Sequence, residues 1–375
     1  MALPSGRPKW ACTVVVGAVL AALAAGDSSA QNAQEKEKTK AARAKGKNTP
    51  VAKKAPNALD PLAAAAGKTA PPPGTFHYTF KIISYDRTPL AASYYPSRLG
   101  LTAPVLLLVH EKDRSRKDFT EPIADLKGVG LAEHMQAQGY AVLSFDLRGH
   151  GENLRRPLAS KEWRMMAGDL QAAYRFLVDR TNRGELNLGK LGVIGVGEGA
   201  NLVAAWAALP GGAVSIEGRV SDLGAVVLIS PLADGEGFLL REVASQLAQR
   251  FPMLVMAGQR DASSAEPVLA IKPLIERDRK NKVELFPSSL HGYKLLRLEP
   301  KATSILARFL EGTVKYKALE WTPRYNLTPV ATEDIQVVRN TKTVEPAKAK
   351  AEEKEAPANK AKDEAKDQEA APAKK

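Results

Sequence analysis

A glycine-rich stretch from Lys190 to Trp206 could do chemistry in either of two ways. It reads KLGVIGVGEGANLVAAW. Gly195, Gly197 and Ala200 fit G-x-G-x-x-G/A, the strand-to-helix turn that binds a dinucleotide pyrophosphate. The same residues fit G-x-S-x-G, the turn that exposes a nucleophilic serine for acyl transfer, except that Gly197 stands at the serine's position. Residues elsewhere in the chain have to decide between the two.

The dinucleotide reading lacks its other requirements. Such a fingerprint follows the first strand of its domain, and an acidic residue at the end of the next strand binds the ribose. Here the glycines follow about the fifth expected strand, and the next strand ends in Ser230 and Pro231. Asp222 precedes that strand and so lies at its wrong end. We therefore expect no nucleotide site and predict no cofactor.

The acyl-transfer reading requires an acid and then a histidine, in that chain order. Asp261 follows the strand-like run PMLVMAG, and His291 follows the last such run, VELFP. The carboxyl ends of parallel strands meet at one edge of a sheet, which is where ligands bind in open α/β folds. We therefore expect Asp261 and His291 to meet there opposite Gly197, as the acid and base of a triad without its nucleophile.

A further motif upstream makes the pattern specific. The stretch D-x-R-G-H-G consists of Asp146, Arg148, Gly149, His150 and Gly151. With the turn, the acid and the histidine in order, it resembles the α/β-hydrolase fold, in the branch of single-domain esterases, dienelactone hydrolases and serine aminopeptidase-like proteins. The resemblance covers about residues 76–314. It implies a mostly parallel central sheet with helices on both faces, and the short segment between Ser230 and Pro252 leaves no room for a large lid domain.

The first departure from that family is the missing nucleophile. Gly197 has no side-chain atom with which to attack a carbonyl carbon. Removal of the nucleophile lowers turnover by roughly 10⁶ in comparable enzymes. Glycine adopts the strained conformation of the turn freely, whereas a residue with a Cβ atom is destabilised there by about 1–3 kcal/mol. Gly197 therefore keeps the shape of the turn but provides no nucleophilic side chain.

The second departure lies in the loop after APVLLLVH. The family usually has His-Gly there, and a backbone amide of this loop stabilises the developing oxyanion. In this chain Glu111 and Lys112 follow His110. A carboxylate at Glu111 would oppose the charge that the loop should stabilise, unless it points to solvent. Glu198 follows Gly197 at a variable position of the motif and cannot replace the serine. Glu111, Lys112 and Glu198 are the candidate oxyanion-site residues.

Two functions stay open on these residues. One is a non-catalytic (pseudoenzyme) binding or scaffold protein whose residual pocket holds a small ligand. The other is a carboxylic-ester or peptide hydrolase with a displaced nucleophile, for which Ser230 is the candidate. Its oxygen would have to lie within about 3 Å of the His291 ring, or of a water between them.

The other polar residues of these motifs have structural interpretations. His110, His150, Asp146 and Arg148 are expected to hold loops through hydrogen bonds. No group of His, Asp and Glu has metal-ligand spacing, so no metal site is predicted.

Elements that would position these residues follow one another between Phe76 and about Val314. TFKIISYDRTPLAASYYPS reads as a hairpin of two strands. Continuous apolar runs such as APVLLLVH and GAVVLIS suit strands that are buried on both faces. Between them, EWRMMAGDLQAAYRFLVDR carries apolar residues at helical spacing. Alternating strands and helices predict a single α/β domain with a mostly parallel sheet.

The start of the chain has the parts of a secretory signal. Arg7 and Lys9 precede an apolar run from Ala11 to Ala25, and small residues lead to a cleavage position before Gln31. The run is short against the roughly 20 residues of a spanning helix, which disfavours an uncleaved anchor. We therefore expect residues 1–30 to be removed, no transmembrane span afterwards, and a periplasmic, cell-envelope or extracellular location. Cys12, the single cysteine, lies inside this segment, which excludes disulfides and thiol chemistry from the mature protein.

The remaining segments differ in composition from the domain. Residues 31–75 form a basic Ala/Lys/Pro linker and residues 341–375 a mixed-charge Ala/Lys/Glu tail, and both are predicted to be disordered because they offer no core. Residues 315–340 are a C-terminal extension. The net charge of +13 reflects the linker in part, which could attract anionic envelope polymers or remain a solvated spacer. No aromatic residues interleave with the lysines, so no nucleic-acid partner is expected.

Overall fold

The computed structural model describes residues 60–67, 72, 74–153, 156–209, 221–324 and 329–340. The predicted signal peptide, most of the predicted linker and the predicted tail therefore lie outside the described residues. Among the described residues, no helix combines the length and the apolar character that a membrane crossing requires.

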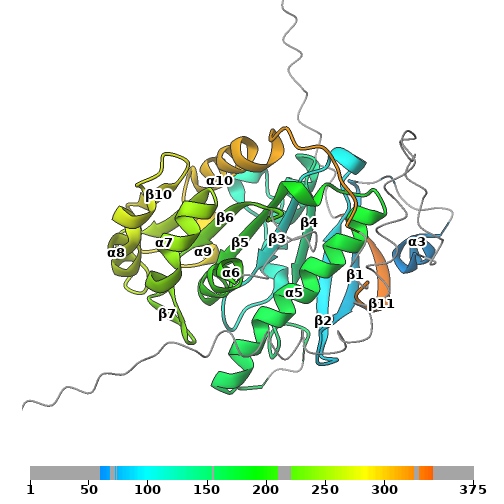
Figure 1. Cartoon of the computed structure of the whole chain (residues 1–375), viewed down its shortest axis with the longest axis horizontal. Helices are drawn as coiled ribbons and strands as arrows, with labels where there is room; N and C mark the ends of the chain where they lie inside the picture. Colours follow the sequence, from blue (N-terminus) through cyan, green and yellow to red (C-terminus); the bar gives the residue numbers. More distant parts are fainter. Residues whose placement is uncertain are drawn as a thin grey trace, which may run out of the picture. The chain divides into compact units, whose positions relative to one another are not determined.

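A nine-stranded sheet forms the centre of the described part, in the order β10-β9-β6-β5-β3-β4-β2-β1-β11 (Figure 1). Its strands are β1 (Phe76–Ile83), β2 (Pro89–Tyr95), β3 (Val105–Val109), β4 (Ala141–Phe145), β5 (Leu191–Val196), β6 (Leu223–Ile229), β9 (Met253–Gly258), β10 (Lys282–Phe286) and β11 (Thr332–Arg339). Each pair between β4 and β10 is parallel, whereas β2, β1 and β11 join by antiparallel pairing. The predicted mostly parallel α/β fold is confirmed.

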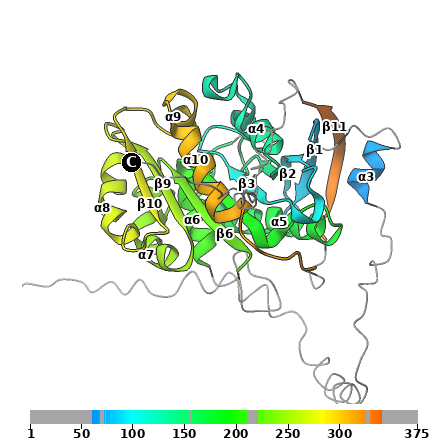
Figure 2. The ribbon, with the colours of Figure 1, turned by 90° about the horizontal axis from the view of Figure 1, so that it is seen from above.

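Helices cover both faces of the sheet (Figure 2). One face packs against α5 (Ser160–Asn182), α6 (Glu198–Ala208), α7 (Leu240–Arg250) and α8 (Ala265–Ile275), and the other against α4 (Leu131–Ala137), α9 (Tyr293–Leu298) and α10 (Ala302–Leu310). The central strands are buried along their whole length, because apolar side chains leave on both sides into a helical layer. A short hairpin, β7 (Asp234–Gly235) and β8 (Phe238–Leu239), lies between β6 and α7.

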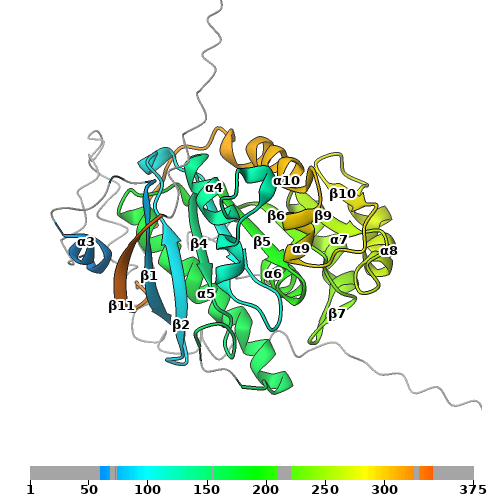
Figure 3. The ribbon, with the colours of Figure 1, turned by 180° about the vertical axis from the view of Figure 1, so that it is seen from behind.

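The C-terminal extension, which was predicted to lie outside the domain as residues 315–340, contributes a strand to the central sheet. β11 pairs antiparallel with β1, from Phe76 opposite Arg339 to Ile82 opposite Thr332, and forms an edge of the sheet (Figure 3). Asn340, which follows β11, donates a hydrogen bond from Nδ2 to Oε1 of Gln136 on α4 at 2.7 Å. The sequence did not predict β11 because its pairing partner β1 lies more than 200 residues earlier in the chain.

Part of the predicted linker is a helix in the structure. Helix α3 (Pro61–Ala66) begins after Asp60, whose side chain accepts a hydrogen bond from the N–H of Leu62 at 3.1 Å. Both oxygens of Asp60 also lie 3.0 Å from Nη1 of Arg180, which is buried on α5. The carboxylate that begins the helix is therefore held by a distant cation, and composition alone could not indicate that contact.

Candidate functional site

The turn between β5 and α6 has the sharp shape that the motif predicts. Gly197 has φ 55° and ψ −128°, a conformation that favours glycine. Its N–H donates to the carbonyl of Ile229 at 2.9 Å, and its own carbonyl accepts from the N–H of Ala200 at 3.0 Å. A Cβ atom at Gly199 would lie 2.2 Å from the carbonyl oxygen of His110, so the helix approaches the loop after β3 closely. The sharp turn of the motif is thus formed, and Gly197 lies in it.

The structure brings Asp261 and His291 together, as the chain order predicts. Asp261 follows β9 and His291 follows β10, and Nδ1 of the histidine lies 2.7 Å from Oδ2 of the aspartate. Burial alone would raise the pKa of Asp261, but hydrogen bonds from Ser264, His291 and the N–H of Ser263 outweigh it and lower that pKa. An ionised carboxylate only accepts, so Nδ1 carries a proton and Nε2 is the ring nitrogen left for other partners.

Glu111 occupies the place beside Nε2. Its side chain is 14% exposed, with Oε2 at 3.9 Å from Nε2 of His291 and Oε1 at 3.8 Å from Nε of Arg114. Burial raises the pKa of Glu111, an effect that electrostatic interactions with His291 and Arg114 oppose. The possibility that this carboxylate points to solvent is therefore wrong. No hydrogen bond from another described residue reaches its carboxylate oxygens.

Glu111 fills the space above two glycines. A Cβ atom at position 197 would lie 2.7 Å from Cβ and 3.2 Å from Oε2 of Glu111. A Cβ atom at position 292 would lie only 1.7 Å from Oε2. Both Gly197 and Gly292 have positive φ, 55° and 60°. The glutamate side chain therefore fits only because neither glycine has a side chain.

A second carboxylate engages the candidate oxyanion loop. Oε2 of Glu198 accepts a hydrogen bond from the N–H of Lys112 at 3.1 Å. This N–H belongs to the loop after β3, from which the fold takes one of its two oxyanion donors. The side chain of Lys112 forms an ion pair with Glu236 and lies 5.8 Å from the centre of the Trp163 ring. The carboxylate of Glu198 thus accepts the hydrogen bond of this loop N–H, a contact that the sequence did not predict.

Ser230 makes no direct hydrogen bond to His291 within the described part of the chain. It is fully buried, and its Oγ accepts a hydrogen bond from the N–H of Gly292 at 2.9 Å. Its own N–H donates to the carbonyl of Met256 at 2.7 Å, and its φ is 48°. The hydroxyl orients the backbone next to His291.

The residues expected to hold loops make such contacts. Nε2 of His110 accepts from the N–H of Leu147 at 2.9 Å, so Nδ1 carries the proton and donates to the carbonyl of Glu111 at 2.7 Å. Burial lowers the pKa of His110 to about 4, which keeps the ring neutral. His110 thereby fixes the backbone of Glu111.

The D-x-R-G-H-G stretch is held in the same way. Asp146 accepts from the N–H of Arg116 at 2.7 Å, while Nε of Arg148 donates to the buried Asp169 at 2.7 Å. Nδ1 of His150 lies 2.8 Å from the carbonyl oxygen of Arg148. Within the described ranges, no group of three or more His, Cys, Asp or Glu residues is placed to hold a metal ion.

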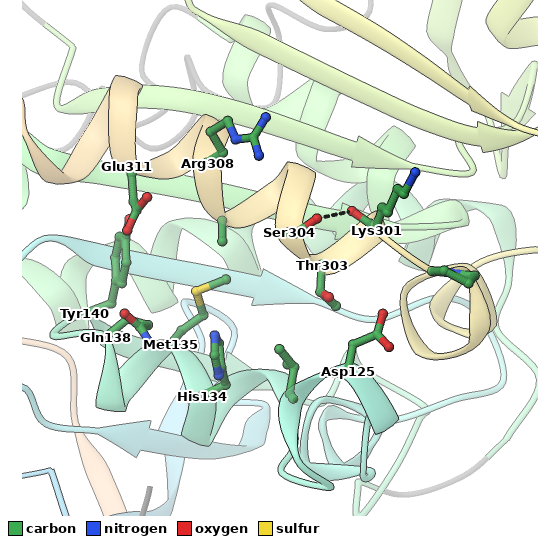
Figure 4. Close-up of a pocket in the computed structure, with 13 residues that line it drawn as sticks. Asp125, His134, Met135, Gln138, Tyr140, Lys301, Thr303, Ser304, Arg308 and Glu311 are labelled. Atoms are coloured by element: carbon green, nitrogen blue, oxygen red, sulfur yellow. Dashed lines mark hydrogen bonds between the residues drawn. The ribbon is translucent and has the colours of Figure 1, made fainter. Parts of the chain in front are cut away.

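A groove of about 730 Å³ lies elsewhere, between α4 and α10 (Figure 4). His134 and Met135 point into it from α4, and Glu311 lies beside Tyr140 at one end. Neither the turn at Gly197 nor the Asp261–His291 pair contributes to its lining. The groove is therefore separate from the residues that the motifs single out.

Comparison with known proteins gives one family match over part of the chain and several solved structures with a similar fold. A family model described as serine aminopeptidase, S33, matches residues 128–267, a range that contains Gly197 and Asp261. No curated protein is similar enough to count as a match.

Similar solved structures include an esterase of Pyrococcus furiosus, with 17% identity over 64% of this chain and 93% of that chain and a TM-score of 0.48. A dienelactone hydrolase from Anabaena variabilis has 21% identity over 63% and 95%, with a TM-score of 0.41. An acylaminoacyl peptidase of Pyrococcus horikoshii has 14% identity over 65% of this chain and 43% of its own, with a TM-score of 0.47. The nine-stranded, mostly parallel sheet with helices on both faces is an α/β fold, and the match to the serine aminopeptidase family over residues 128–267 agrees with an α/β-hydrolase fold.

Proposed function

We propose that this α/β-hydrolase-fold protein is a non-catalytic binding or scaffold protein. The observation that carries the proposal is the position of Glu111, which fills the space above Gly197 where a nucleophile would have to stand. Acyl transfer needs a nucleophile, a base that takes its proton and donors for the oxyanion. The base is present as His291 with Asp261, but the nucleophile is absent and one loop donor, the N–H of Lys112, already binds Glu198.

A displaced serine does not repair this deficit. The buried hydroxyl of Ser230 accepts a hydrogen bond from the N–H of Gly292. This contact holds the backbone beside His291, which is a structural role. A ligand at this site would therefore contact the partly exposed faces of His291 and Lys112, whose side chains are 34% and 40% exposed. Those two side chains are partly exposed to solvent at this site.

The proposal includes export and a charged surface partner. The basic start, apolar run and small residues of positions 1–30 favour a signal peptide. The lysine-rich linker would then attract anionic polymers of the cell envelope through long-range electrostatics. Binding of this kind weakens steeply as salt is added, because it depends on screened charges.

The test is labelling of the protein, without its predicted signal peptide, by a fluorophosphonate probe. We expect no labelling above that of heat-denatured protein and no added hydrolysis of nitrophenyl acetate, because both reactions need an activated hydroxyl. The matched control variants are Ser230→Ala and His291→Ala, which should behave as the unmodified protein does. Labelling of the unmodified protein that disappears in either variant would show an active hydrolase.

A further inference from the structure

We propose that Glu111 is an internal plug in a latent acyl-transfer site, so that serine chemistry returns only when position 197 gains a hydroxyl and position 111 loses its side chain. The inference rests on the proposed function, because it assumes that the unmodified site is inactive. The substrate class is small activated acyl or phosphonyl esters, whose reacting group would take the volume that Glu111 now fills.

The acid and base of this latent site are already in working geometry. Nδ1 of His291 is bound to Asp261 at 2.7 Å, which leaves Nε2 directed at the carboxylate of Glu111. Three hydrogen bonds lower the pKa of Asp261 and keep the Asp261 carboxylate ionised. An ionised aspartate is what stabilises the imidazolium that forms in a triad. A proton acceptor of the right kind therefore faces the place of the missing hydroxyl.

Glu111 and a side chain at position 197 exclude each other. The clash at 2.7 Å is with Cβ of Glu111, which cannot rotate away, rather than with the end of a flexible side chain. Relief would require the backbone of the loop to move, yet His110 fixes that backbone through the carbonyl of Glu111 and the N–H of Leu147. Gly197→Ser alone therefore adds a hydroxyl that has no room to reach His291.

The choice of replacement at position 111 follows from the same distances. Glu111→Gly removes every atom that a Cβ at position 197 would meet within 3.4 Å, whereas Glu111→Ala keeps the Cβ that lies at 2.7 Å. The alanine variant is therefore a matched control, since it removes the same carboxylate but retains the clash. A difference between the two would show that volume, and not charge alone, closes the site.

The restored step can be written in full. The hydroxyl oxygen introduced by Gly197→Ser attacks the phosphorus of a fluorophosphonate, an O–P bond forms, the P–F bond breaks and fluoride leaves. The hydroxyl proton passes to Nε2 of His291. The N–H of residue 198, at the first position of α6, has no partner within the helix and is one oxyanion donor. Glu198→Ala releases the N–H of Lys112 as the other, which can raise turnover by a factor on the order of 10²–10³.

The experiment compares probe labelling of the full chain in five forms. These are the unmodified protein, Gly197→Ser, Glu111→Gly, the double variant Gly197→Ser/Glu111→Gly and the control Gly197→Ser/Glu111→Ala. We expect only the Gly197→Ser/Glu111→Gly protein to be labelled, at position 197 by peptide mass spectrometry. Its labelling rate should exceed that of the unmodified protein by more than about 10²-fold, still far below the roughly 10⁶ that a complete nucleophile supplies. Adding His291→Ala should abolish it.

Two results would overturn the plug. If Gly197→Ser alone is labelled as fast as the double variant, Glu111 does not exclude a side chain at position 197. If the double variant unfolds cooperatively yet remains unlabelled, the Asp261–His291 pair does not act as a base for a hydroxyl at position 197. Labelling of the unmodified protein would instead contradict the proposed non-catalytic function. The experiment therefore distinguishes a failure of that function from a failure of the role given to Glu111.

A stability measurement applies even if the double variant folds poorly. Gly197→Ala should lower the urea midpoint of the unmodified protein more than that of the Glu111→Gly protein, because the clash exists only in the first background. Equal shifts in both backgrounds would contradict the exclusion.

Discussion

Oε2 of Glu111 lies 3.9 Å from Nε2 of His291, and among the described residues no group donates a hydrogen bond to it. A buried carboxylate in this position is poorly compensated, and burial accordingly raises its pKa. Glu111 therefore destabilises the folded state in its ionised form, although its side chain fills the site. Under the proposed function, this contact explains how the site keeps a base and excludes a nucleophile.

Replacement of Glu111 by glutamine should change how stability depends on pH. A carboxyl group whose pKa is higher in the folded state than in the unfolded state contributes stability in its protonated form. That contribution is fully present below the unfolded-state pKa and is lost as pH rises through the folded-state pKa. Glu111→Gln does not titrate, so it should be more stable than the unmodified protein at pH 7, with a difference that shrinks towards pH 4. Urea unfolding at several pH values measures this. A glutamine variant that is less stable at pH 7 would contradict the poor compensation of the carboxylate.

Asp261 should show the opposite dependence. The pKa of Asp261 is lowered in the folded state. Its contribution to stability is therefore present above the unfolded-state pKa and is lost as pH falls through the folded-state pKa. Asp261→Asn should lower the free energy of unfolding at pH 7 by about 1.5–3 kcal/mol, the range for hydrogen bonds to a charged group. The loss should be smaller at pH 3. Asp278→Asn, at an exposed carboxylate, is the control and should have little effect at either pH.

Ser230→Ala separates a structural serine from a displaced nucleophile. The substitution leaves the buried N–H of Gly292 without its acceptor, which should cost about 1–3 kcal/mol of stability. It should leave ester hydrolysis and probe labelling unchanged. Chemical unfolding and a fluorophosphonate assay on the same preparation test both halves. An unchanged stability together with a loss of labelling would reverse the assignment.

Helix α3 should belong to the stable domain. Leu62 is 1% exposed, and its burial corresponds to roughly 1.5–3 kcal/mol. A chain that begins at Phe76 should therefore unfold at lower urea concentration than one that begins at Leu59. Limited proteolysis should likewise leave a fragment that starts before Asp60 and extends to about Asn340. Rapid cleavage between Asp60 and Phe76, with no loss of stability, would show that α3 does not contribute.

Much of the architecture and the acid–base pair follow from the sequence by itself. Continuous apolar runs determine which strands are buried on both faces, and their alternation with helical stretches determines a parallel sheet. Parallel strands present their carboxyl ends at one edge, so residues that follow β9 and β10 must come close whatever the details of packing. Asp261 and His291 meet for that reason. The glycine at position 197 of the motif, on which the proposed loss of the nucleophile rests, is likewise visible in the sequence alone.

Only the tertiary structure decided what fills the site. The direction of the Glu111 side chain depends on space left by Gly197 and Gly292, which come from two other strand-to-helix connections. The role of the Ser230 hydroxyl and the anchoring of Asp60 by Arg180 depend in the same way on residues distant in the chain. A sequence pattern reports periodicity and order, whereas the volume and the hydrogen-bond partner available to one side chain are set by atoms that the fold brings from elsewhere.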